Sequence, residues 1–421
     1  MKVSVLAQTP YRDLEDDFAE HYESCVTTPW RLVDTGKLHG SFRDSLDQML
    51  FAAGQGFDGV GFTEHGQSAY DMMPSPTVML SALAYATDRD SLDVAIYPVG
   101  RSLGKTKEPL RAAEELAMLD CISGGRMIAG FPIGLAYDAS SNNGVPPIDV
   151  RARYDEGLAL VLRAWSEPDP FAFNGRFNQH RTVNLWPRPI QVPPPIWITG
   201  VGNPATMAFA LENGFGFNYF GWFGMEMTGE RIFPRFWEQA ERLGQPRNPH
   251  RVAVMQTVCV GDDDADAERT YAQHVEYFFN NGLGTMSAGR VGLPGGIGVP
   301  GLKAIMRDPG DFGMFPKLKT ATYADLLENG CVIAGGPDTV AEKLIDVCRR
   351  FGIGHLLAVL QVGSLGKEET ERNIALFADK VLPRLRELWP DEEYPNHWWP
   401  QRLGGAPSLV SANTTTNLQA V

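Results

Sequence analysis

The sequence predicts an α/β fold, more narrowly a (β/α)8 (TIM) barrel, and three observations lead to this prediction. Eight short strand-like runs alternate with helical periodicity along the chain. The GxGxxG signature of the rival doubly wound sheet is missing after the first run, where Gln8 is followed by Thr9 and Pro10. The length of 421 residues suits one elaborated barrel, because such barrels often use more than ~200 residues in one domain.

Each predicted strand is a short run rich in β-branched or aromatic residues and bounded by turn residues. In chain order the strands are expected at 2–8, 59–64, 93–99, 126–134, 195–200, 216–221, 252–260 and 355–363. Helices are expected at 41–55, 108–122, 149–165, 204–213, 229–243, 264–280, 337–351 and 368–388. Pro204 and Pro337 suit the first turns of their helices, where a backbone N–H is not needed.

Three segments do not fit a minimal barrel. Residues 9–40 form a long insertion after strand 1, and the stretch 282–301 after strand 7 contains eight glycines. Barrel enzymes carry their active-site loops after the C-terminal ends of the strands. We therefore expect one domain over 1–395, with 281–325 as a mobile lid, although a disordered surface loop is the alternative. Residues 396–421 are predicted to be a poorly ordered C-terminal tail.

Charge and cysteine usage narrow the class of protein. The net charge of −14 argues against nucleic-acid partners and anionic membranes, which select basic surfaces. No stretch approaches the roughly 18 apolar residues that a membrane span needs. Five scattered cysteines without a CxxC pair indicate reduced, buried thiols and a cytoplasmic location. No HxxxH or HExxH pair indicates a metal site, and no GxSxG sequence indicates a serine hydrolase.

Five segments, spread over about residues 1–390, resemble the bacterial luciferase-like flavin-dependent monooxygenase family. They are FDGVGFTEH (57–65), RAAEELAMLDCISGGR (111–126), PRPIQ with PIWI (187–198), GGPDTVAEKL (335–344) and LFADKVLP (376–383). The resemblance implies a two-component monooxygenase that uses O2 and reduced FMN, supplied by a separate flavin reductase. It also implies a homodimer.

The expected activity is therefore oxygenation of a small, partly apolar organic substrate. Two alternatives stay open: hydride transfer with a deazaflavin, or a flavin-free barrel that acts as a partner subunit or a non-redox enzyme.

The resemblance implies that His65, at the end of strand 2, is the catalytic acid or base, and an imidazole titrates in the range that proton transfer needs. Glu64 is expected either to orient the ring or to support a loop. Relatives often have a second histidine where this chain has Gly66, which removes one proton carrier or widens the pocket.

The same resemblance places the flavin ring against strands 3 and 4, with Tyr97, Pro98, Phe131 and Pro132 as cofactor-binding residues. The Tyr97–Pro98 peptide bond is predicted to be cis, because this conformation costs only about 0.5–1 kcal/mol before proline. Ile133 stands where many relatives have an arginine for the flavin phosphate, and an isoleucine cannot replace a guanidinium.

The loop between strand 5 and its helix is the expected phosphate site. Its glycines allow close approach, and a helix start favours an anion. The residues proposed to bind the cofactor here are Gly200, Val201, Gly202, Asn203 and Thr206.

Polar, aromatic and Met residues near strand ends are candidates for the substrate pocket, with core packing as the alternative. These are Gln8, Tyr70, Met73, Trp222 and Gln361, with Met72, Phe223 and Met225 nearby. Arg101, Lys105 and Lys107 follow strand 3; they are expected on a solvated face, with anion binding as the alternative.

Overall fold

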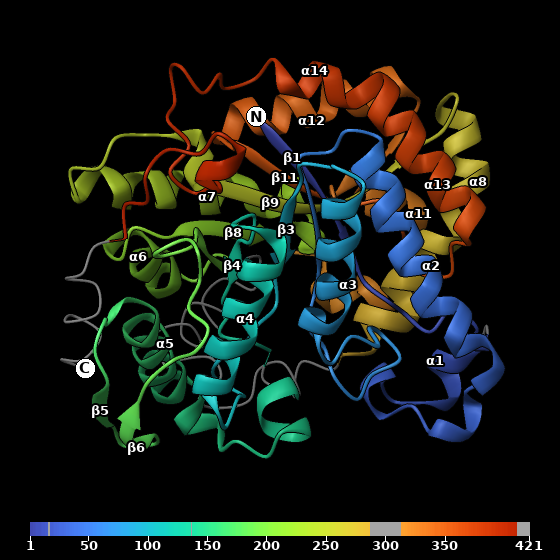
Figure 1. The fold of residues 1–421 in the computed structure, drawn as a ribbon. Coiled ribbons are helices and arrows are strands. Elements are labelled where there is room, and N and C mark those ends of the chain that lie inside the picture. Colours follow the sequence, from blue (N-terminus) through green and yellow to red (C-terminus); the bar gives the residue numbers. More distant parts are fainter. Residues whose placement is uncertain (16, 136, 287–312, 411–421) are drawn as a thin grey trace.

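The computed structural model describes all residues except 16, 136, 287–312 and 411–421. Its parallel strands confirm the (β/α)8 barrel, in the spatial order β3-β2-β1-β11-β9-β8-β7-β4 (Figure 1). A parallel bridge between Ile96 and Met127 joins the two ends of this order. There the N–H of Ile128 donates to the carbonyl of Ile96 at 3.0 Å, so the barrel is closed.

Every barrel strand lies within a predicted run. The strands are β1 (Lys2–Ala7), β2 (Gly59–Phe62), β3 (Ala95–Pro98), β4 (Ala129–Gly130), β7 (Ile196–Gly200), β8 (Gly216–Phe220), β9 (Val252–Val260) and β11 (His355–Val359). Strand β10 (Val332–Gly335), which pairs with the end of β9, was not predicted from the sequence. Nor was the hairpin of β5 (Phe171–Asn174) and β6 (Gln179–Val183). Strands this short carry too few residues for a period to show.

The main helices are α1 (Phe18–His21), α2 (Thr35–Gly54), α3 (Pro76–Arg89), α4 (Pro109–Ser123), α5 (Val150–Ser166), α6 (Pro204–Glu212), α7 (Met225–Arg242), α8 (Asp264–Tyr277), α11 (Tyr323–Glu328), α12 (Pro337–Phe351), α13 (Lys367–Leu376) and α14 (Leu382–Arg386). Helix α3 was not predicted from the sequence. The predicted start of α2 is too late, because the cap is Asp34, whose side chain accepts from the N–H of Gly36 at 2.9 Å.

Side chains alternate along the strands between the barrel interior and the helix layer, as the period of two requires. One cluster fills the interior and includes Leu6, Tyr97 and Trp197. The residues next to them in the chain, Val5, Ile96 and Ile198, pack outward with the helices. Any ligand at the C-terminal mouth of the barrel therefore meets the inward set.

The N-terminal end of the barrel is covered by residues that were predicted to fray. Trp398 and Trp399 are 3% exposed, and the carbonyl of Trp398 accepts from the indole N–H of Trp197 at 3.0 Å. The prediction of a poorly ordered tail is therefore wrong for 396–410, because two tryptophans bury there. Residues 411–421 lie outside the described residues, as do residues 287–312 of the predicted lid. No helix in the described part of the chain is long and apolar enough to cross a membrane.

Two buried histidines make this end of the barrel sensitive to acid. Burial lowers the pKa of His250 to about 4, and burial with the neighbouring His250 lowers the pKa of His355 well below its usual value. Because both folded-state pKa values lie below the unfolded value, the unfolded chain binds more protons, and stability falls as the pH drops below about 6.5.

We therefore expect wild-type protein to lose about 2 kcal/mol of unfolding free energy through His250 between pH 7.5 and pH 5, and to lose more through His355. Urea unfolding at both pH values measures this loss. His355→Gln should show the smaller difference, whereas His39→Gln at an exposed position should behave as wild type. An equal difference in all three proteins would show that His355 does not contribute.

Candidate active site

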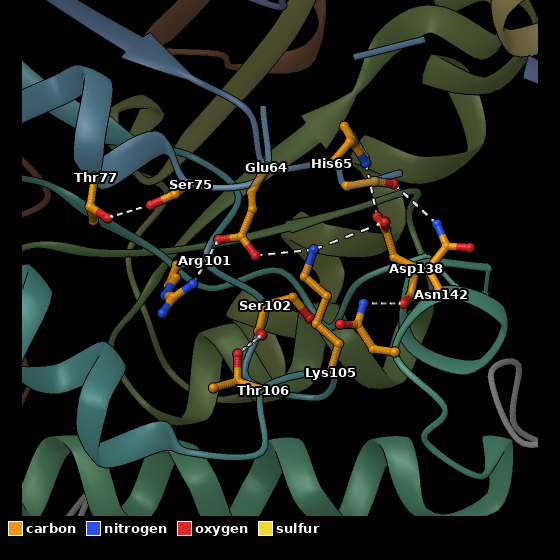
Figure 2. A network of polar contacts seen from close by, with 12 residues as sticks. Glu64, His65, Ser75, Thr77, Arg101, Ser102, Lys105, Thr106, Asp138 and Asn142 are labelled. Carbon is orange, nitrogen blue, oxygen red and sulfur yellow. Dashed lines mark hydrogen bonds and ion pairs between the residues drawn. The ribbon is translucent and has the colours of Figure 1, made fainter. Parts of the chain in front are cut away.

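His65 follows β2 at the C-terminal end of the barrel and is held by two residues from the segment after β4. Its Nδ1 lies 2.9 Å from Oδ2 of Asp138 and 3.0 Å from the hydroxyl of Tyr137. Both partners belong to a π-helical turn, Tyr137–Asn142. Figure 2 shows the carboxylate of Asp138 pointing at the imidazole. The imidazole is thereby fixed in orientation and has an acidic partner.

A chain of alternating charges continues from this pair into the barrel wall (Figure 2). Lys105 Nζ lies 4.0 Å from Oδ1 of Asp138 and 3.0 Å from Oε1 of Glu64. Arg101 Nη1 lies 3.4 Å from the other oxygen of Glu64. Glu64 therefore binds the loop that follows β3. Arg101 and Lys105, expected on a solvated face, are only 13% and 9% exposed and serve as partly buried counter-charges. Lys107 is exposed as expected.

Electrostatics favour the charged pair at His65. Burial by itself would lower the pKa of His65, but the charge and hydrogen bond of Asp138 outweigh it and raise that pKa above its usual value. Burial would likewise raise the pKa of Asp138, but His65 and Lys105 lower it. The carboxylate of Asp138 therefore favours the protonated imidazole, which can release its proton to a nearby acceptor.

Aromatic side chains surround this pair. The ring of Tyr70 lies edge-on to His65 at 5.2 Å and stacks on Phe278 at 5.9 Å. Trp222 packs against the same Phe278 at 4.9 Å. Two of the residues predicted for the substrate pocket, Tyr70 and Trp222, are thus brought together through a third ring. The surroundings of His65 combine an apolar wall with a charged pair.

Several inward side chains near the mouth have polar atoms without a hydrogen-bond partner among the described residues. These atoms are Gln8 Nε2, Tyr97 Oη, Asn218 Oδ1, Thr257 Oγ1 and Gln361 Oε1. All five side chains are buried. An unmade hydrogen bond at a buried group costs about 1–3 kcal/mol. The interior therefore suits a ligand whose edge carries both donors and acceptors.

One sequence prediction fails at this site, and two predicted site residues have side chains that face outward. The Tyr97–Pro98 bond is trans, because Pro98 continues the regular parallel ladder opposite Phe62 and needs no reversal there. The side chains of Phe131 and Met73 pack in the outer cluster with the helices, Phe131 against Trp165. Both side chains therefore point away from the barrel interior.

The predicted phosphate loop lies where expected, between β7 and α6, but part of its hydrogen-bonding capacity is already used within the protein. Asn203 caps the helix by accepting from the N–H of Ala205 at 2.9 Å. Gly202 has a φ of +86° and packs under Ile232. Thr206 is buried and Val201 is exposed. Ile133 packs against the outer core, and its side chain has no charge with which to bind a phosphate. A Cβ on Gly66 would meet no atom within 4 Å, so that position is open.

Four residues of the site were not found from the sequence. Asp138 and Tyr137 lie in a polar loop, and nothing local relates them to a histidine 73 residues away. Asn218 and Thr257 do leave a signal, because each is a polar residue within an apolar or aromatic strand. Buried strand positions of this kind are normally apolar, so a polar residue there indicates a binding role.

Known proteins resemble this chain in sequence and in fold. The model of the family described as luciferase-like monooxygenase matches residues 23–355. The FMNH2-dependent dimethylsulfone monooxygenase of Pseudomonas putida is 29% identical over 86% of this chain and 90% of its own length. The oxygenase component of the flavin-dependent trigonelline monooxygenase of Acinetobacter baylyi is 26% identical over 52% of this chain and 58% of its own length.

Solved structures share the fold. The monooxygenase RslO1 of Streptomyces bottropensis superposes with a TM-score of 0.67 at 23% identity, over 91% of this chain and 99% of that one. An F420-dependent secondary alcohol dehydrogenase superposes with a TM-score of 0.64 at 16% identity, over 91% and 99% of the two chains. The chain spans about half the length of several curated relatives, including two uncharacterised proteins of Sinorhizobium fredii at 47% and 45%.

Proposed function

The chain belongs to the luciferase-like monooxygenase family, and from this premise we propose that it is the oxygenase of a two-component flavin-dependent monooxygenase. It uses O2 and reduced FMN delivered by a separate flavin reductase, and it oxygenates a small, partly apolar organic substrate. The observation that carries the proposal is the set of buried, unpartnered polar atoms at the mouth, beside the His65–Asp138 pair.

The residues present fit a flavin ring. The ring is flat, and its pyrimidine edge carries alternating carbonyl oxygens and N–H groups, which match a mixed set of donors and acceptors. Tyr97, Asn218 and Thr257 supply unpartnered hydroxyl and amide atoms from three different strands. Thr206 and the backbone of the loop at 200–206 are the groups that would hold the phosphate. Reduced FMN, when bound, supplies the electrons that activate O2.

The chain's own contribution is placement, proton transfer and exclusion of water. His65, whose protonated form is favoured by its contact with Asp138, donates a proton to an oxygen atom of the reacting complex. Tyr70, Trp222 and Phe278 form an apolar wall that keeps bulk water away from that proton.

Anaerobic titration with reduced FMN, followed by admission of air, tests the cofactor. We expect saturable binding of reduced FMN and, with a substrate present, oxygen uptake matched by an oxygenated product. Binding of reduced F420 in place of FMN, with substrate reduction and no oxygen uptake, would instead support the deazaflavin alternative. Binding of neither would contradict a flavin enzyme.

We also propose a homodimer, formed through α3 and α4, which lie side by side in Figure 1. These helices expose Val78, Tyr85, Met118 and Ile122, which are 69%, 65%, 49% and 39% exposed. Apolar side chains grouped on neighbouring helices favour association.

Sedimentation equilibrium measures the oligomeric state. The double substitution Tyr85→Asp and Met118→Asp should convert a dimer into a monomer, because it buries charge at the interface. Trp186→Asp, at an exposed apolar residue in a different segment, should leave the mass unchanged. A wild-type monomer, or a dimer in the double variant, would contradict this interface.

A further inference from the structure

A lysine lies beside the His65–Asp138 pair, between two buried acids (Figure 2). Nζ of Lys105 is 3.0 Å from Oε1 of Glu64 and 4.0 Å from Oδ1 of Asp138. The other oxygen of Asp138 faces the imidazole. The side chain of Lys105 is only 9% exposed, and removing an ammonium from water is unfavourable unless acidic groups compensate it. Its place therefore indicates that these two carboxylates need a cation.

The loop after β3 fixes Lys105 at this position. The hydroxyl of Ser102 donates to the carbonyl of Ile133 at 2.8 Å, which binds this loop to the segment after β4. Gly104 allows the close approach, since a Cβ there would lie 2.9 Å from the same carbonyl oxygen. Because Asp138 belongs to the segment after β4, the loop holds the ammonium next to its carboxylate.

The oxygen of Asp138 that faces Lys105 has room for a partner. Oδ1 has no hydrogen-bond partner among the described residues, and its 4.0 Å from Nζ is about 1 Å longer than a charge-assisted hydrogen bond. A lysine has a flexible stem and three N–H donors, so a small movement closes this gap. Glu64 keeps a cation when this happens, because Arg101 Nη1 lies 3.4 Å from its other oxygen.

Lys105 gives Asp138 a counter-charge other than the imidazole. The side chain of Asp138 is 3% exposed, so water compensates its charge only weakly. With Lys105 beside it, His65 can become neutral without leaving this carboxylate unpaired. Without Lys105, release of the proton would leave an uncompensated charge in the protein interior, which is strongly unfavourable.

The other titratable groups around His65 do not supply this cation. Burial raises the pKa of Tyr70 and of Tyr137, so both hydroxyls stay neutral. Asp71 is completely buried, and burial raises its pKa as well. Burial and the charge of Lys105 act to lower the pKa of His65, against the opposite effects of Asp138 and Asp71. Among the described residues, Lys105 is therefore the cation that opposes the acids beside the imidazole.

We propose that Lys105 is a positioning residue for the proton transfer from His65: its ammonium pairs with Asp138 as the imidazole becomes neutral. Since Nδ1 faces Asp138, the N–H bond at Nε2 breaks, and its proton passes to an oxygen atom of the reacting complex. Lys105 keeps all its protons and acts only through its charge. The inference rests on the proposed function, because it takes His65 as the proton donor of the oxygenation.

NMR titration of His65 in the full-length, flavin-free protein tests the charge coupling. In Lys105→Met the pKa of His65 should be higher than in wild type, because the neutral imidazole would leave Asp138 without a cation. Lys107→Met, at an exposed position of the same loop, should titrate as wild type. If Lys105 merely held Asp138 in place, its loss would loosen the carboxylate and lower the pKa of His65.

The rate of oxygenation tests the role in proton transfer. Lys105→Met should lower the turnover number about 10-fold or more, because release of the proton would leave a buried carboxylate unpaired. The alkaline limb of the rate profile should move to higher pH, and the Kd for reduced FMN should stay near the wild-type value. Lys107→Met should match wild type in all three measurements.

An unchanged or lowered pKa of His65 in Lys105→Met would overturn the proposal, as would an unchanged turnover number. If Lys105→Met does not fold, the double variant Lys105→Met with Glu64→Gln removes one charge of each sign and should show the same upward shift of the pKa. Failure of wild-type protein to bind reduced FMN would refute the proposed function, while the NMR titration would still decide the coupling between Lys105 and His65.

Discussion

Replacing His65 with alanine is expected to reduce the turnover number for oxygenation by about 10²–10⁴-fold, the usual contribution of a positioned acid or base. The reason is that the side chain carries the imidazole whose protonated form Asp138 favours and which donates the proton in the proposed mechanism. The Kd for reduced FMN should stay near the wild-type value, because the unpartnered atoms that fit the ring lie on other strands. Product formation from a substrate that wild-type protein oxygenates measures the effect.

Asp138→Asn separates proton transfer from simple packing. The carboxylate raises the pKa of His65, so its loss should lower that pKa. Because the imidazole of His65 then loses its proton at a lower pH, the alkaline limb of the rate profile should move to lower pH. His39→Ala, at an exposed site, is the control. An unchanged turnover number in His65→Ala would show that His65 has no catalytic role. An unshifted alkaline limb of the rate profile in Asp138→Asn would show that Asp138 does not control the pKa of His65.

Trp197→Ala is expected to lower the free energy of unfolding by about 3–5 kcal/mol, the range for deleting a buried aromatic side chain. The indole is 1% exposed, contacts the ring of His355 at 4.8 Å and donates to the carbonyl of Trp398. Its loss creates a cavity and also removes the contact that holds the C-terminal segment on the barrel.

Urea unfolding at pH 7.5 provides the measurement. Trp186→Ala removes the same side chain at a position that is 81% exposed, and it should change the unfolding free energy by less than about 0.5 kcal/mol. A loss below about 1 kcal/mol in Trp197→Ala would mean that the segment at 396–410 contributes little to stability.

The candidate site was predictable only in part, and His65 shows why. A residue type and a strand end are local facts, so the sequence places His65 at the mouth of the barrel. Its partner Asp138 is 73 residues distant and lies in a loop, whose path depends on contacts made elsewhere. The burial of Arg101 and Lys105 was misjudged for the same reason, since their acidic partners come from other segments.

Tyr97, Phe131 and Met73 show a second limit. All three lie in or near strands, and a strand sends its side chains to both faces. Without the register, the sequence could not say that Tyr97 faces the interior while Phe131 and Met73 face the helices. A shift of one residue reverses these directions.

The sequence by itself determined where the barrel strands lie, that helices alternate with them, and which family the motifs resemble, because periodicity and motifs are properties of short segments. Only the tertiary structure decided that Asp138 contacts His65, that Tyr97–Pro98 is trans, and that Trp398 and Trp399 close the N-terminal end. Those outcomes depend on burial and on contacts between distant segments, whose energies exist only once the chain has folded.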